Sequence, residues 1–516
     1  MWESTLGHAG LQRHAQDKAV RSTREAMLVL MATAAWLAAT SWWRPLALPD
    51  EGRYVGVAWE MLHSRDWLVP TLDGLPFLHK PPLWYWLTAA AMSAFGAHEW
   101  AARLASLTGA TLAAWALYLF VRRWADVARA RTVLIVLLTM PLYFGGAQYA
   151  NHDMLVAAFV TMTILAAAHA VLLRETSVPW GSTLLCAYAL AALGVLTKGL
   201  IGAVLPALVI AAWLLATRRV RLLALLAWWP GWLMFGLIAV PWFVAMQARY
   251  DGFLDYFVVV QHFKRYAGGG FNNERAWWFY AAALALFTMP WSPWIALVLR
   301  RRFFADGPRR DLRVLMAVWL AVVLVFFSLP RSKLVGYVLP ALPALAFLLA
   351  EVVATRRVRV IAGVAAVICV AIVTGVGIAA PHSAQPAVES MRDKMTVRDR
   401  VLVLDRPVYD LAFYLRLVGP VPVASDWAGS PLRDDWRREL LDAAAFAPES
   451  ARRILLPSDQ ASAWLCRAGT TWVFGDADSV DRHRWLTQAQ PVYSDGSLAV
   501  WRWPGAAGTE GCRAAP

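Results

Sequence analysis

The segment 49–82 carries residue types that could do chemistry, and it lies between two long apolar regions. It begins with the adjacent acids Asp50 and Glu51, followed by Arg53, and it ends with His79 and Lys80 before two prolines. Charged groups beside a hydrophobic span are costly to hold, so they usually serve a function. A carboxylate here could accept a proton from an acceptor hydroxyl, and the cations could bind a phosphate.

The composition indicates that these residues belong to a polytopic membrane protein. Of the 516 residues, 59% are hydrophobic and only 16% are charged. The 29 tryptophans suit the boundary between hydrocarbon and headgroups. Arginine-rich loops that set the topology and contact anionic lipid explain much of the net charge of +14, so we expect no nucleic-acid partner.

Apolar segments near the length of about 20 residues that a transmembrane helix needs recur along the chain. We predict spans at 26–43, 100–121, 132–149, 154–173, 181–197, 199–216, 222–247, 276–299, 312–329, 334–352 and 358–380. The segment 83–95 is apolar but short, which favours an interfacial helix. The first segment follows a long basic lead without a clear small-residue cleavage site, so we interpret it as a retained span.

The arginine distribution predicts which loops share a side. With the N-terminus inside, alternate connections are short and basic, which marks the cytoplasmic side. These connections contain Arg122, Arg174, Arg218, Arg300 and Arg356. The opposite side receives every unusual polar motif: 49–82, Asn151-His152-Asp153, Thr197-Lys198-Gly199, Gln261 to Tyr266 and Arg331-Ser332-Lys333. Either these motifs meet in an active site built from loops, or each merely caps a span.

The character of the chain changes after about residue 381. Strand-like segments at 401–404, 421–424, 453–456, 471–474 and 493–503 alternate with helix-like ones, which predicts a small α/β domain. It carries neither a glycine-rich phosphate loop nor a metal-ligand cluster, so we interpret it as a lid or docking domain. Cys466 and Cys512 could form a disulfide there if the region is exported.

Cations on the predicted non-cytoplasmic face point to a lipid phosphate. They are Arg53, Lys80, Lys198, Arg265 and Lys333. Several arginines and lysines that converge at a bilayer surface suit a phosphate that carries a hydrophobic tail. The sequence therefore predicts group transfer in which a polyprenyl phosphate leaves and the cations stabilise its developing charge.

The same residues carry a family resemblance. The pattern DEGRY…EML…DWLVP…G.PFLHKPPL.YWL…FG..E..ARL, from Asp50 to Leu104, resembles the GT-C type glycosyltransferases that use polyprenyl-phosphate sugars. It is most similar to the bacterial aminoarabinose transferases of lipid A and their protein-mannosyltransferase-like relatives. Asn151-His-Asp153, Leu196-Thr-Lys-Gly199 and Ser332 to Pro340 match further motifs, so the resemblance covers about residues 26–350 and plausibly the tail.

The resemblance implies a GT-C fold, that is, a polytopic α-helical membrane protein with interfacial helices in the first periplasmic loop and a small C-terminal periplasmic α/β domain. The implied parts are a cytoplasmic N-terminus (1–25), a transmembrane catalytic domain (26–380, first periplasmic loop 44–99) and the periplasmic domain (381–516). It also implies a bacterial inner-membrane location with the active site on the periplasmic side.

The resemblance implies Asp50 and Asp153 as catalytic residues. The substrate-binding candidates are Glu51, Arg53, His79, Lys80, Lys198, His262, Arg265, Lys333 and Tyr337. Glu51 could instead be a solvated neighbour of Asp50. His79 stands where the aminoarabinose transferases commonly have Glu, which bears on recognition of an amino group on the sugar.

The implied partners are an undecaprenyl-phosphate-linked sugar donor, membrane lipids, and an acceptor that is lipid A or another envelope glycolipid. The implied reaction is transfer of the 4-amino-4-deoxy-L-arabinose type. A protein O-mannosyltransferase-like enzyme, a flippase or transporter, and a polymerase of lipid-linked glycans remain alternatives. We assign no metal site: His79 and His262 lack a third ligand pattern and are interpreted as hydrogen-bonding residues, with a divalent metal left open as a cofactor.

Overall fold

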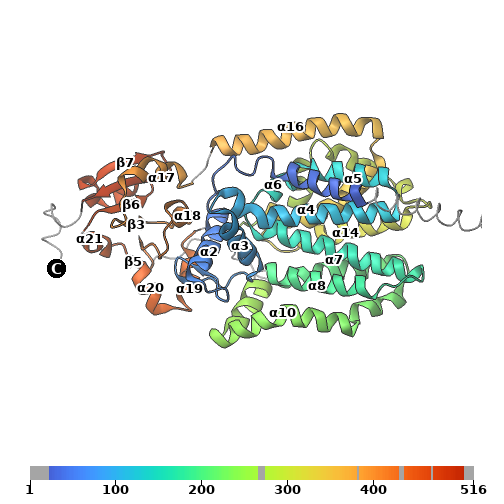
Figure 1. Cartoon of the computed structure of the whole chain (residues 1–516), viewed down its shortest axis with the longest axis horizontal. Helices are drawn as coiled ribbons and strands as arrows, with labels where there is room; N and C mark the ends of the chain where they lie inside the picture. Colours follow the sequence, from blue (N-terminus) through green and yellow to red (C-terminus); the bar gives the residue numbers. More distant parts are fainter. Residues whose placement is uncertain (1–22, 265–272, 380–382, 429–434, 467–468, 505–516) are drawn as a thin grey trace, which may run out of the picture.

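The structure, a computed structural model, describes residues 23–264, 273–379, 383–428, 435–466 and 469–504. Figure 1 shows a bundle of long helices and a smaller sheet-containing part, with helices α2 (Asp50–Ser64) and α3 (Leu83–Phe95) between them. The predictions for residues 1–22, for Arg265 and for Cys512 concern positions outside the described residues.

The bundle consists mainly of long apolar helices, which lie roughly parallel in Figure 1. Residues 23–38 are helical. The other helices of the bundle are α4 (Glu99–Trp124), α5 (Val127–Leu138), α6 (Pro141–Ala147), α7 (His152–Glu175), α8 (Gly181–Lys198), α9 (Ile201–Ala216), α10 (Trp229–Arg249), α12 (Phe279–Phe287), α13 (Ile295–Val298), α14 (Arg310–Ser328), α15 (Leu342–Val352) and α16 (Thr355–Ala379). Shorter turns join them: η1 (Val220–Ala227), η2 (Asp255–Lys264), η3 (Ser292–Trp294), η4 (Arg301–Phe304) and η5 (Val335–Ala341).

Seven helices in the described part of the chain are long and apolar enough to cross a membrane, or eight if the bent pair α5 and α6 is one span. The prediction of a polytopic helical membrane protein is therefore confirmed. Three of the eleven predicted spans do not pass this test as helices: 26–43, 199–216 and 276–299. The described helix at the first is only 16 residues long, α9 is equally short, and prolines divide the third into α12, η3 and α13.

The basic connections meet at one end of the bundle. Arg129, after α4, pairs with Glu351 at the end of α15, and Arg309, before α14, pairs with the same carboxylate. Arg219, after α9, pairs with both Glu175 at the end of α7 and Asp311 in α14. The predicted grouping of these loops on one side is thus realised in space, through ion pairs between loops distant in sequence.

The polar segment 49–82 folds over the opposite end of the bundle. Helix α2 is followed by the short antiparallel pair β1 (Thr71–Leu72) and β2 (Leu75–Pro76), and then by α3. Helix α3 is 13 residues long and buries Trp84, Tyr85 and Met92 against its neighbours, as expected for a helix too short to span. The whole segment therefore forms a structured platform between the bundle and the tail.

The tail forms one sheet of six strands in the described residues, in the order β5-β4-β3-β6-β8-β7. The strands are β3 (Arg400–Leu404), β4 (Val423–Ser425), β5 (Leu455–Pro457), β6 (Thr471–Gly475), β7 (Gln490–Ser494) and β8 (Ala499–Trp503). The helices are α17 (Gln385–Met391), η6 (Arg392–Lys394), α18 (Leu411–Leu415), α19 (Arg438–Ala444), α20 (Pro448–Ile454), α21 (Gln460–Leu465), α22 (Ser479–Arg482) and η7 (Arg484–Gln488).

The first four strands of that order are mutually parallel, and β8 and β7 form the predicted antiparallel hairpin. The prediction of a small α/β unit is confirmed. Cys466 is disulfide-bonded, and Cys186 and Cys369 are free. Cys369 is buried and Cys186 is exposed.

The tail packs tightly against α2. Gly52 and Gly56 lie one turn apart on the face of α2 that meets Tyr409 and Asp410, and a Cβ at Gly52 would lie 3.0 Å from the Asp410 backbone nitrogen. Hydrogen bonds between a backbone group and a side chain join the two parts. The Leu46 N–H donates to the Tyr414 hydroxyl at 2.8 Å. The indole of Trp59 donates to the Leu417 carbonyl at 2.6 Å. The absence of side chains at the two glycines lets the tail approach α2 closely.

Candidate functional site

A polar cavity of about 640 Å³ lies where α2, the ends of the bundle helices and the tail meet. It is lined by Pro49, Asp50, Arg53, Tyr54, Phe77, His79, Lys80, Asn151, His152, Asp153, Lys198, Asn273, Glu274, Arg275, Leu334, Tyr337, Asp435, Trp436 and Glu439. Three polar motifs far apart in the sequence, 49–82, 151–153 and 197–199, thus share one wall. Three of the five polar motifs that could form one site therefore meet here.

Asp50 is the first residue of α2 and points into the polar cavity, with its side chain 35% exposed. The positive end of the helix dipole favours a carboxylate at this position. Its Oδ1 accepts a hydrogen bond of 2.6 Å from Arg53, one turn later. Arg53 is also paired with Glu439 of α19, so the tail takes part in orienting the cation beside Asp50.

Glu51 does not face the cavity, which corrects both of its predicted roles. Its side chain is fully buried and accepts hydrogen bonds from Arg44, Arg103 and the backbone N–H of Ala47 and Ala150. Burial alone would raise the pKa of Glu51, but the charges and hydrogen bonds of Arg103 and Arg44 hold it at about 2. Glu51 is a buried ionic link between α2, α4 and the segment before α7.

Asp153 lies in the first turn of α7 and lines the cavity. The N-cap of α7 is Asn151, whose side chain accepts from the Asp153 backbone N–H at 2.9 Å. The Asp153 carboxylate pairs with Lys198, the last residue of α8. A Cβ on Gly336 would lie 2.3 Å from Asp153 Oδ2, so η5 packs directly on this carboxylate.

A second, apolar cavity of about 370 Å³ adjoins the first. Its walls come from bundle helices and their connections, namely Leu200, Ile201, Val204, Gln261, Phe263, Phe326, Phe327, Pro330 and Ser332. Lys80, Lys198 and Tyr337 line both cavities. The Lys198 ammonium lies 4.3 Å from the centre of the Tyr337 ring, a cation–π contact. Two cations and a phenol therefore mark the junction of a polar and an apolar space.

His79 lines the polar cavity and is stacked on Phe77, with ring centroids 4.6 Å apart. Its Nε2 lies 3.0 Å from the Tyr256 hydroxyl and 3.8 Å from the Asp442 carboxylate of the tail. Burial, the main cause, raises the pKa of Asp442. The tail therefore places carboxylates near His79 and Arg53, on the side of the cavity opposite the bundle.

Lys333 lines neither cavity, contrary to its predicted role in binding substrate. It is 3% exposed, and its ammonium donates to the Pro330 carbonyl and, at 3.1 Å, to the Arg275 carbonyl. Burial lowers its pKa. Lys333 thus joins the segment 330–333 to the segment 273–275, which does line the polar cavity.

Two predicted residues remain without a structural placement. Arg265 lies outside the described residues, and so does the side chain of His262. Within the described residues, no group of three His, Cys, Asp or Glu side chains is arranged to hold a metal ion.

Several cavity residues escaped the sequence-based prediction. His152 is 2% exposed, lies between the rings of Tyr54, Trp84 and Tyr85, and has no hydrogen-bond partner for either ring nitrogen among the described residues. It belongs to the Asn-His-Asp motif, which was a signal for it. Arg275 and Glu439 gave no such signal, because a single arginine or glutamate in a connecting segment resembles any solvated charge.

Known proteins resemble this chain in sequence and in fold. A sequence family described as dolichyl-phosphate-mannose-protein mannosyltransferase matches residues 79–244. An undecaprenyl phosphate-alpha-4-amino-4-deoxy-L-arabinose arabinosyl transferase of Pseudomonas aeruginosa strain LESB58 is 32% identical over 320 residues, which cover 60% of this chain and 56% of that protein. A transferase of the same name from Sodalis glossinidius is 32% identical over 318 residues, 60% of this chain and 55% of that protein.

The chain thus spans a little over half the length of these curated relatives. The crystal structure of ArnT from Cupriavidus metallidurans bound to undecaprenyl phosphate superposes with a TM-score of 0.78 at 22% identity, over 95% of this chain and all of that one. An oligosaccharyltransferase of Archaeoglobus fulgidus, AglB, superposes with a TM-score of 0.51 at 12% identity, over 93% and 74%. The predicted resemblance to the aminoarabinose transferases and the predicted GT-C fold are confirmed.

Proposed function

We propose that this protein is a glycosyltransferase that moves a sugar from undecaprenyl phosphate to lipid A or a related envelope glycolipid. The proposed sugar is of the 4-amino-4-deoxy-L-arabinose type, because the curated relatives carry that name. The proposed place is the periplasmic side of the bacterial inner membrane. The basic loops at the far end of the bundle support this side, since they suit the cytoplasm.

The junction of the two cavities is the observation that carries the proposal. A polyprenyl-phosphate sugar has an apolar chain, an anionic phosphate and a polar sugar in that order. The apolar cavity suits the chain, Lys80 and Lys198 at the junction suit the phosphate, and the polar cavity suits the sugar. A soluble nucleotide donor would leave the apolar cavity without a purpose.

The reaction needs an acceptor oxygen that attacks the anomeric carbon of the sugar. The bond between that carbon and the phosphate oxygen breaks, and undecaprenyl phosphate leaves with the bonding electrons. Where the acceptor oxygen carries a proton, Asp50 takes it; where the acceptor is an ionised phosphate, Asp50 orients it. The cations at the junction stabilise the charge that develops on the leaving phosphate.

The second catalytic carboxylate in the proposal is Asp153. Its ion pair with Lys198 fixes the ammonium at the junction, and Tyr337 covers the other side of that ammonium. The buried ring of His152 also lines the polar cavity, and neither of its ring nitrogens has a protein partner among the described residues.

Transfer with purified components tests the proposal. Full-length protein in lipid nanodiscs receives undecaprenyl-phosphate 4-amino-4-deoxy-L-arabinose and lipid A, and mass spectrometry follows the acceptor. We expect the acceptor to gain the mass of the sugar, and Asp50→Asn to lower the rate by about 10² to 10⁴ while the protein remains folded. Full activity of a folded Asp50→Asn protein would contradict the role of Asp50, and an unmodified acceptor would contradict the proposed function.

A second candidate, a protein O-mannosyltransferase-like enzyme, is supported by the family match over residues 79–244. The same mass-spectrometric assay, with polyprenyl-phosphate mannose as donor and a serine-rich and threonine-rich peptide as acceptor, distinguishes the two candidate functions. A flippase would move the labelled donor lipid between leaflets without forming a new glycosidic bond.

A further inference from the structure

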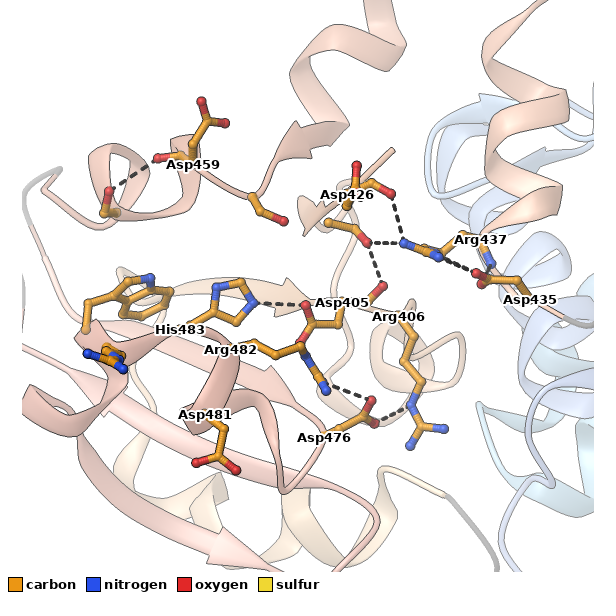
Figure 2. Close-up of a pocket in the computed structure, with 15 residues that line it drawn as sticks. Asp405, Arg406, Asp426, Asp435, Arg437, Asp459, Asp476, Asp481, Arg482 and His483 are labelled. Atoms are coloured by element: carbon orange, nitrogen blue, oxygen red, sulfur yellow. Dashed lines mark hydrogen bonds and ion pairs between the residues drawn. The ribbon is translucent and has the colours of Figure 1, made fainter. Parts of the chain in front are cut away.

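The tail contains a cleft of its own, with a volume of about 840 Å³. It lies at the carboxyl ends of the parallel strands β3, β4, β5 and β6, because the residue that directly follows each of these strands lines the cleft. These residues are Asp405 after β3, Asp426 after β4, Ser458 and Asp459 after β5, and Asp476 after β6. These residues line the cleft, and Figure 2 shows Asp405 near its middle, with Asp426 above it and Asp476 below it.

The position in the sheet is the one at which open α/β sheets bind ligands. From β3 the chain passes to β4 on one side and later returns to β6 on the other side of β3. The strand order therefore reverses between β3 and β6, and a crevice forms outside their carboxyl ends. Asp405 and Asp476 stand on the two sides of that crevice.

The polar groups in the cleft are held in place before any ligand binds. The carboxylate of Asp405 accepts from Ser479 at 2.7 Å, from Arg482 at 2.8 Å and from His483 at 2.9 Å. Burial alone would raise the pKa of Asp405, but the hydrogen bonds from His483, Arg482 and Ser479 hold it at about 2. Asp405 is therefore a fixed, ionised acceptor at the base of the cleft.

The charges of the cleft decide which ligand suits it. The described lining contains six carboxylates, four guanidiniums and one imidazole. Three of the arginines are already paired with these acids: Arg406 with Asp476, Arg437 with Asp435, and Arg482 with Asp405. A phosphate or another anion would meet excess negative charge here, and the described residues hold no three-ligand group for a metal.

We propose that this cleft binds a neutral or amine-bearing sugar residue of the acceptor, away from the point of transfer. The inference rests on the proposed function. Asp435 lines both this cleft and the polar cavity, so the two spaces adjoin across the segment that begins α19. An extended saccharide acceptor could therefore occupy the cleft while its reacting end lies beside Asp50.

The chemistry of the lining suits sugar hydroxyls. Each hydroxyl donates one hydrogen bond and accepts others, so paired carboxylates and guanidiniums satisfy it well. Trp485 offers a partly buried indole at the edge of the cleft, against which the apolar face of a sugar ring could pack. The side chains of Asp459 and Asp481 are exposed to solvent, and they lie on opposite sides of Asp405 in Figure 2.

Binding is tested first, on the full-length protein in nanodiscs and without donor. The probe is the β-1,6-linked glucosamine disaccharide without acyl chains or phosphates. Its binding is measured by saturation-transfer difference NMR. We expect the double variant Asp459→Asn/Asp481→Asn to weaken binding by about 10-fold, because two charged acceptors become neutral while their shape is kept. Glu449→Gln on α20 removes an exposed acid of the same part that does not line the cleft, and it should bind like the wild type.

Transfer to lipid A is measured next on the same variants. We expect the KM for the acceptor to rise by about 10-fold in the double variant, and in Trp485→Leu, relative to Glu449→Gln. Trp485 is partly buried, and its replacement by Leu can impair folding. Asp459 and Asp481 are exposed, so the double variant Asp459→Asn/Asp481→Asn still tests the inference in that case.

Each outcome separates the two proposals. The inference is overturned if the wild type transfers the sugar but the cleft variants show an unchanged acceptor KM and unchanged disaccharide binding. That result would leave the proposed function intact. Disaccharide binding that depends on the cleft, without any transfer by the wild type, would overturn the proposed function instead. Competition of inorganic phosphate with the disaccharide would also overturn the inference, because it would show an anion site.

Discussion

Arg53 of α2 and Glu439 of α19 form an ion pair between positions 386 residues apart in the chain. The same guanidinium donates to Asp50 at 2.6 Å. The tail is therefore joined to the carboxylate to which we assign catalysis, and it does more than cover the cavity.

We expect Glu439→Gln to lower transfer by about 10-fold, because Arg53 loses a charged partner and its position beside Asp50 becomes less defined. The measurement is the rate of sugar transfer at saturating donor and acceptor. Glu449→Gln, which removes an exposed acid from the same part of the chain, is the matched control. Equal rates for both variants would show that the ion pair does not position Arg53.

Replacing the carboxylate by an amide should mainly lower stability at position 51 and mainly lower activity at position 50. Glu51→Gln leaves Arg44 and Arg103 buried without their counter-charge, and we expect it to destabilise the protein by about 3–5 kcal/mol. Asp50→Asn, at a partly exposed position, should change the unfolding temperature little while it lowers the transfer rate by about 10² to 10⁴. Thermal unfolding in detergent and the transfer assay together check this, and a stable Glu51→Gln protein would refute it.

Gly336 tests whether the position of Asp153 matters. A methyl group there would lie 2.3 Å from Asp153 Oδ2, so Gly336→Ala must displace the carboxylate or η5. We expect transfer to fall by about 10² without any change of charge at the site. The control is Gly363→Ala in α16, where an added Cβ meets nothing within 4 Å and activity should stay at the wild-type level. Unimpaired Gly336→Ala would argue against a catalytic role for Asp153.

Asp410 should make the stability of the protein depend on pH. It is fully buried beside Gly52, and Oδ2 accepts from Ser383 and Ala384, while Oδ1 has no hydrogen-bond partner among the described residues. Burial raises its pKa from 3.8 to about 7. The folded state therefore holds a proton that the unfolded chain releases near pH 4.

The contribution of Asp410 to the free energy of unfolding is accordingly full below about pH 4, falls as the pH rises to about 7 and is then constant. The loss across this window is on the order of 4 kcal/mol. Asp410→Asn removes the titration, so its unfolding temperature should decline less between pH 5 and pH 8 than that of the wild type. Parallel profiles for both proteins would contradict this prediction.

The membrane class, the helical bundle, the order of the tail strands along the chain and the candidate residues Asp50, Lys80, Asp153, Lys198 and Tyr337 followed from the sequence. Hydropathy and strand alternation are local properties, and the membrane class, the bundle and the strand order depend on them, whereas the roles of the candidate residues were implied by the family resemblance. Average hydropathy does not register the prolines that divide the predicted span 276–299 into α12, η3 and α13.

Only the tertiary structure decided which charges face a cavity. Asp50 and Glu51 are adjacent and chemically alike, yet the helix directs one to the cavity and the other into a buried ion pair with Arg44 and Arg103. Lys333, which was expected to bind substrate, is buried among carbonyls, whereas Arg275, for which nothing was expected, lines the cavity. The roles of such residues depend on partners tens to hundreds of positions away, and a single sequence does not specify those contacts.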